Sequence, residues 1–110
     1  MTDLDLTLGQ GPTGPLLAVA GDLDHNTAEQ LRAAVDDVAL APGQLLTLDL
    51  SGLDYCDSSG ITALLAARNH VQSRAAEFAV SNVPPTTARI FSLLGLDEIF
   101  PSRPMPPGSA

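Results

Sequence analysis

Apolar and polar residues recur along this chain with two different periods. Residues 3–8 alternate with a period of two, which predicts a strand with one covered face and one face in water. The apolar run at 16–20 predicts a more buried strand, and the glycines and prolines between the two runs predict a turn. We therefore expect a hairpin with residues 3–8 at the edge of a sheet. Two further strands are expected at 45–50 and 77–81.

Between the strands, apolar residues spaced three or four apart predict helices. The first is expected over 27–40, where Thr27 and Gln30 have the spacing of a capping box. The second follows a turn expected at 51–52 and begins at or next to Ser58.

The third helix is expected to begin at 84–85, because proline suits a first helical turn. Gly95 predicts that this helix ends in a Schellman motif, and residues 99–100 predict a short final strand. The predicted buried face of the helix consists of Ile90, Phe91 and Leu94.

The order of these elements predicts an α/β fold, with a central mixed, largely parallel sheet of four to five strands layered with helices. The chain has 110 residues, of which 45% are hydrophobic and 16% charged, so we expect one packed domain. Residues 1–100 should form this domain. Residues 101–110 include four prolines and should form a flexible tail.

Thirteen acidic residues against five basic ones give a net charge of −8, which disfavours direct binding to nucleic acid or anionic lipid. The beginning of the chain does not resemble a signal peptide, and no apolar run approaches the ~20 residues of a membrane span. The single cysteine, Cys56, excludes an internal disulfide. We therefore expect a soluble cytoplasmic protein.

Polar residues gather at two junctions that follow strands of the expected parallel core, at 21–27 and 53–60. Binding sites of open α/β sheets lie where strands end and helices begin, so both junctions should open on the same edge. Ser58 is expected at the mouth of a helix, where unpaired N–H groups and the helix dipole can hold a phosphate. Alternatively, Asp57 or Ser58 only caps the helix.

A phosphate on Ser58 would add about −1.5 to −2 charges beside Asp57 and Asp24. At an exposed site each electrostatic contribution amounts to ~0.3–1 kcal/mol, so the fold should tolerate the phosphate. A partner that buries the hydroxyl would instead meet a desolvated dianion, which is far more costly. We therefore expect phosphorylation to act on binding and not on the fold.

The sequence disfavours catalysis. A hydrolase nucleophile elbow needs a glycine where Cys56 stands, and a triad would have to be completed by His25 with Asp24. Cys56 itself is expected to be buried and unreactive. No phosphate-binding Walker loop or calcium loop is found, so neither a cofactor nor a metal is expected. The loop acids, expected to be solvated, are Asp22, Asp24, Asp49, Asp54 and Asp57.

Three segments resemble the STAS domain of bacterial anti-sigma factor antagonists: residues 20–27 (AGDLDHNT), 48–61 (LDLSGLDYCDSSGI) and 89–96. The resemblance covers residues 3–100, and its middle segment is the specific one. In that family the serine directly after the aspartate, here Ser58, is phosphorylated by an anti-sigma factor that is also an ATP-dependent serine kinase. The resemblance implies that the unphosphorylated protein binds this kinase and frees a sigma factor, and that a PP2C-like phosphatase resets it.

The resemblance also places the partner-binding residues at the two junctions. They are Asp22, Asp24, His25, Asn26, Asp57, Ser58, Ser59 and Gly60. STAS domains also serve as non-switching interaction modules, such as accessory subunits of lipid transporters or scaffolds of stress signalling, and in that alternative Ser58 only caps a helix. The edge strand at 3–8 offers a surface on which a second copy would form a homodimer.

Overall fold

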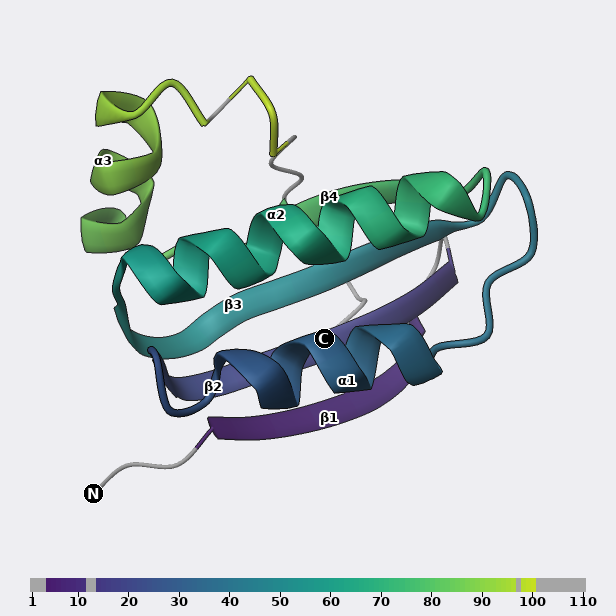
Figure 1. Cartoon of the computed structure of the whole chain (residues 1–110), viewed down its shortest axis with the longest axis horizontal. Coiled ribbons are helices and arrows are strands. Elements are labelled where there is room, and N and C mark those ends of the chain that lie inside the picture. The colour runs from purple at the N-terminus through teal and green to yellow at the C-terminus, as the bar shows by residue number, and fades with distance from the viewer. Residues whose placement is uncertain (1–3, 12–13, 97, 101–110) are drawn as a thin grey trace.

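The computed structural model describes residues 4–11, 14–96 and 98–100 (Figure 1). Within them the chain forms four strands and three helices. The strands are β1 (Leu4–Gly11), β2 (Gly14–Leu23), β3 (Leu45–Cys56) and β4 (Glu77–Ser81). The helices are α1 (Ala28–Asp37), α2 (Ser58–Ser73) and α3 (Pro85–Leu93). The tail expected at 101–110 lies outside the described residues.

The four strands form one mixed sheet in the order β1-β2-β3-β4. β1 pairs antiparallel with β2, whereas β2, β3 and β4 run parallel. Parallel neighbours need crossover connections, which α1 and α2 supply, and these helices lie side by side over the same face of the sheet (Figure 1). The expected fold class is therefore confirmed, with β1 at the edge. Pairing of β1 with a second copy stays a prediction.

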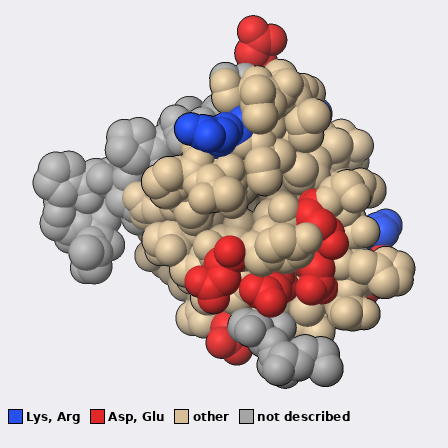
Figure 2. Space-filling model, turned by 90° about the vertical axis from the view of Figure 1, so that its left-hand side faces the viewer, with Lys and Arg blue, Asp and Glu red and all other residues tan. Residues whose placement is uncertain are grey.

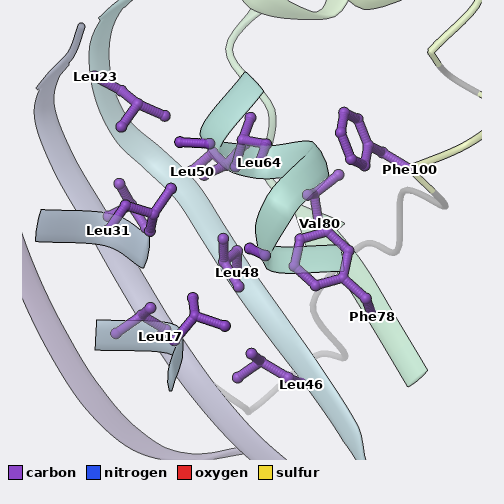
Figure 3. Packing of buried hydrophobic residues seen from close by; sticks show 14 of the residues in the cluster. Leu17, Leu23, Leu31, Leu46, Leu48, Leu50, Leu64, Phe78, Val80 and Phe100 are labelled. Carbon is purple, nitrogen blue, oxygen red and sulfur yellow. The ribbon is translucent and has the colours of Figure 1, made fainter. Parts of the chain in front are cut away.

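The core lies between this face of the sheet and the two helices (Figure 3). Leu46, Leu48 and Leu50 alternate along β3 and are fully buried, and Leu31 of α1 and Leu64 of α2 complete the layer from the helices. Burial of each of these side chains contributes about 1.5–3 kcal/mol. This aliphatic layer therefore fixes the positions of β2 and β3, and the polar junctions follow the carboxyl-terminal ends of these two strands.

α1 is shorter than the spacing of its apolar residues predicts. It ends at Asp37 and not near residue 40, because Val38 adopts extended backbone with a ψ of 125°. Leu31 and Val35 are fully buried, and the Val38 side chain is also buried although it lies outside the helix. The spacing thus predicts the buried residues correctly and the end of the helix wrongly.

β3 is longer than expected, because it continues through the turn expected at 51–52 as far as Cys56. Gly52 allows a close approach to β2 at this point: a Cβ atom there would lie 2.7 Å from the Cβ atom of Ala20. The glycine that indicated a turn in the sequence therefore serves the packing of two strands.

α3 ends in the Schellman motif that Gly95 predicts. Gly95 has a φ of 72°, and its N–H donates to the Ser92 carbonyl at 3.2 Å. The N–H of Leu96 donates to the Phe91 carbonyl at 2.7 Å, which completes the motif. Leu94 is the C-cap residue of α3 and is 61% exposed, so its expected place on the buried face is wrong.

Phe100 extends the core beyond β4. The residue is 1% exposed, and its ring centroid lies 6.0 Å from that of Phe78 and 5.3 Å from that of Phe91. The N–H groups of Ile99 and Phe100 both donate to the Leu96 carbonyl, at 3.0 and 2.8 Å. These bonds form a turn, so the expected final strand is wrong. Packing of the aromatic rings, and not hydrogen bonding to the sheet, therefore holds this segment against the core.

Candidate functional site

β2 and β3 end side by side, and we call residues 22–27 and 54–60 at this end of the sheet the carboxyl edge. In the parallel register Asp22 lies opposite Tyr55, and Leu23 lies opposite Cys56. The two polar junctions therefore open on the same edge, as predicted. Figure 2 views the molecule from this side, and most of the acidic side chains visible on this face gather in its lower half.

Ser58 is the first residue of α2, and it is exposed. Asp57 precedes the helix in extended backbone, and its carboxylate accepts a hydrogen bond from the Gly60 N–H at 3.0 Å. Asp57 is therefore the N-cap, a role worth about 1 kcal/mol to the helix. Since the cap is supplied by Asp57, Ser58 stands accessible at the positive end of the helix dipole without being needed to begin the helix.

The Ser58 turn rests directly on the end of β2. The Asp57 N–H donates to the Leu23 carbonyl at 3.2 Å. Gly60 is buried over the same carbonyl, and a Cβ atom at this position would lie 2.4 Å from the Leu23 oxygen and 2.9 Å from Cys56 Sγ. Only glycine fits here, and its close contact fixes the height of Ser58 above the sheet edge.

Thr27 holds the acidic loop that follows β2. Its hydroxyl donates to the Asp22 carbonyl at 2.7 Å and accepts from the Asp24 N–H at 3.0 Å. The Asp24 carboxylate in turn accepts from the Asn26 N–H at 2.9 Å, and His25 and Asn26 are exposed. The capping box expected for α1 is therefore wrong, because the Thr27 hydroxyl is engaged by the loop before the helix.

Tyr55 belongs to the carboxyl edge although sequence reasoning missed it. Tyr55 lies at the end of β3 and is 54% exposed. It lies opposite Asp22 and three positions before Ser58. The signal available in the sequence was its place inside the specific Asp-Tyr-Cys-Asp-Ser segment, where an aromatic residue stands among acids, since tyrosine is enriched in the residues that dominate protein–protein binding.

Cys56 is buried as expected, with 7% of its surface exposed. Burial, and to a lesser extent the charge of Asp57, raises the pKa of its thiol from 9.0 to about 11. A thiol that stays protonated at neutral pH is a poor nucleophile, so this cysteine acts as a small apolar residue under the Ser58 turn.

The raised pKa predicts a loss of stability in alkaline solution. Between pH 9 and 11 the unfolded thiol ionises while the folded thiol keeps its proton, so the free energy of unfolding should fall as the pH rises through this window. Below pH 9 this contribution should be constant. Urea denaturation of the wild type and of Cys56→Ala at several pH values measures the difference between them. Equal pH dependence of the two proteins would contradict the assignment.

Within residues 4–11, 14–96 and 98–100, no three His, Cys, Asp or Glu side chains are grouped so as to hold a metal ion. None of the helices in this part of the chain is both long enough and apolar enough to cross a membrane.

The fold and the carboxyl edge define a small α/β domain in which a mixed sheet presents two polar loops at one end. The family described as "Mlab, STAS domain" matches residues 6–102, and the chain belongs to this STAS domain family. The resemblance indicated by the sequence motifs is therefore confirmed.

Several proteins of known role or structure are similar to this chain. The anti-sigma F factor antagonist of Paenibacillus polymyxa is 29% identical over 87 residues, which are 78% of this chain and 74% of that protein. The crystal structure of an anti-sigma factor antagonist from Mycobacterium paratuberculosis has a TM-score of 0.77 and 29% identity, covering 91% of this chain and 85% of that one. The phosphorylated form of the Bacillus cell fate determinant SpoIIAA shares the fold, with a TM-score of 0.66 and 22% identity over 90% of this chain and 91% of that one.

Proposed function

We propose that this protein is an anti-sigma factor antagonist that works as a phosphorylation-controlled binding switch in the cytoplasm, and not as an enzyme. In the unphosphorylated state it binds an anti-sigma factor through the carboxyl edge, so that a sigma factor is released. The anti-sigma factor acts as a serine kinase on Ser58 and so ends the association, and a PP2C-like phosphatase resets the switch. The names of the similar proteins support the regulatory role.

The observation that carries the proposal is the position of Ser58. The residue is exposed at the first position of α2, and the neighbouring carboxylate of Asp57 already caps the helix. A kinase can therefore reach the hydroxyl without unfolding the turn. The helix dipole offsets part of the charge of a phosphate at this position, so the domain itself should keep its fold.

The same position makes binding sensitive to the phosphate. A partner that covers the carboxyl edge removes Ser58 from water, and a neutral hydroxyl tolerates this removal if it finds a hydrogen bond. A phosphate there would be a desolvated dianion beside the Asp57 carboxylate, and the repulsion between them grows as water is excluded. Phosphorylation is thus expected to change the stability of the complex far more than the stability of the domain.

The site assignment can be tested by phosphorylation in vitro. The purified protein is incubated with ATP and with each anti-sigma factor kinase encoded in the genome of the organism that produces it. The phosphate is then mapped by mass spectrometry. We expect one phosphate, on Ser58, that is lost in Ser58→Ala and kept in the matched control Ser59→Ala. Undiminished labelling of Ser58→Ala would show that another residue is the acceptor.

A further inference from the structure

A depression lies between the N-terminal halves of α1 and α2, beside Ser59. It has a volume of about 250 Å³, and we call it the α1–α2 depression. The two helices run side by side in Figure 1. Ala28 of α1 and Ala63 of α2, both with small side chains, are among the residues that line the depression. It is lined by His25, Ala28, Glu29, Arg32, Ser59, Thr62 and Ala63.

Arg32 is the basic residue of this depression, and it lies beside the Glu29 carboxylate, which also lines it. The Arg32 side chain is 49% exposed, and its Nη1 lies 2.9 Å from Oε1 of Glu29, one turn earlier on α1. Glu29 is 81% exposed, and such a pair on a helix surface contributes little stability, so it can be exchanged at little cost. The pair nevertheless holds the guanidinium at the rim of the depression, where an incoming carboxylate can replace Glu29.

Asp36, the other acidic residue near Arg32, forms no ion pair with it, so Asp36 does not compete with a partner's carboxylate for the guanidinium. Asp36, which shares a neighbouring hollow with Arg32, has its Oδ1 3.4 Å from Nδ1 of His70 on α2. Inside the α1–α2 depression, the His25 side chain and the Ser59 hydroxyl are further hydrogen-bond donors. A guanidinium flanked by such donors suits a carboxylate, which it can bind with two parallel hydrogen bonds.

We infer that the α1–α2 depression is a second contact for the anti-sigma factor and receives a carboxylate side chain of that partner. This inference rests on the proposed function, and charge complementarity selects the occupant. The acids of the carboxyl edge call for basic side chains on the partner, and Arg32 calls for one acidic side chain beside them. A partner with this arrangement of charges docks in one register, so the depression distinguishes the cognate anti-sigma factor from others.

The test compares two charge reversals on the two sides of the molecule. Arg32→Glu removes the proposed contact, and Arg74→Glu makes the same change of charge at the exposed far end of α2. Calorimetric titration with each purified anti-sigma factor of the host genome should show affinity for the cognate one at least about tenfold lower in Arg32→Glu, and within about twofold of wild type in Arg74→Glu. Arg32→Gln, which avoids repulsion from Glu29, should show the same direction of change, and thermal melting should find both Arg32 variants folded.

The outcomes separate this inference from the proposed function. If Arg32→Glu and Arg74→Glu bind equally well, the inference is overturned and the proposed function stands. If the unphosphorylated wild type binds none of the anti-sigma factors, both are overturned. Restoration of Arg32→Glu binding by an Asp→Arg or Glu→Arg change in the partner would support the carboxylate assignment, and failure of every such change to restore it would refute that assignment.

Discussion

Phosphorylation of Ser58 is expected to lower the affinity for the anti-sigma factor by a factor of about 100 or more. The residue is exposed in the free protein, so the phosphate is fully hydrated there. In the complex it would lie in a contact from which water is excluded, next to the carboxylate that caps α2. The loss of hydration and the like charge of Asp57 both act against the complex, whereas neither acts against the free domain.

Calorimetry on the bare and the stoichiometrically phosphorylated proteins measures this change directly. Ser58→Asp should weaken binding in the same direction but less strongly, because it adds one negative charge and not two. Ser73→Asp, at the exposed end of α2 away from the carboxyl edge, is the matched control and should bind like the wild type. Equal binding by Ser58→Asp and Ser58→Ala would instead identify a non-switching interaction module.

Local sequence signals predicted those parts of the fold that local physics determines. The period of two in β1, the helical spacing of Leu31 and Val35, and the glycine of the α3 Schellman motif each depend on residues within a few positions of one another. The order of the elements then led to a mixed sheet, since parallel neighbours require helical crossovers. These features were confirmed because the contacts with distant residues favour the same local structure.

The errors occurred where a distant contact outweighs a local preference. Ile99 and Phe100 have the composition of a strand, yet Phe100 packs between Phe78 and Phe91, and no local rule announces that contact. Thr27 has the spacing of a capping residue, but its hydroxyl binds the backbone of the preceding loop. In both cases the side chain finds a better partner than the one its sequence neighbours offer.

The carboxyl edge was predictable and the α1–α2 depression was not. The edge follows from a topological rule, because parallel strands bring their following loops to one end of the sheet. The depression depends on which faces of two helices turn toward each other, and on the small size of Ala28 and Ala63 at that contact. The proposal that Arg32 contacts the partner therefore depends on the three-dimensional arrangement.

Replacement of Gly60 by alanine is expected to destabilise the folded protein by about 3 kcal/mol, at the upper end of the usual cost of overpacking. The added Cβ atom would lie 2.4 Å from the Leu23 carbonyl oxygen, which belongs to the backbone of β2 and cannot rotate away. Cys56 Sγ and Leu23 Cγ, each 2.9 Å away, close the remaining space. The first turn of α2 must therefore move off the sheet edge, and the Asp57 N–H would then lose its bond to the same carbonyl.

Urea denaturation of Gly60→Ala and wild type at neutral pH measures this loss. Gly9→Ala is the matched control, because a Cβ atom at Gly9 meets nothing within 4 Å, and its free energy of unfolding should stay within about 0.5 kcal/mol of wild type. Where Gly60→Ala remains folded, it should also be a poorer kinase substrate than Gly9→Ala, since the displaced turn carries Ser58. Wild-type stability in Gly60→Ala would mean that the turn yields without strain, and that the contact with Leu23 does not set the position of the phosphoacceptor.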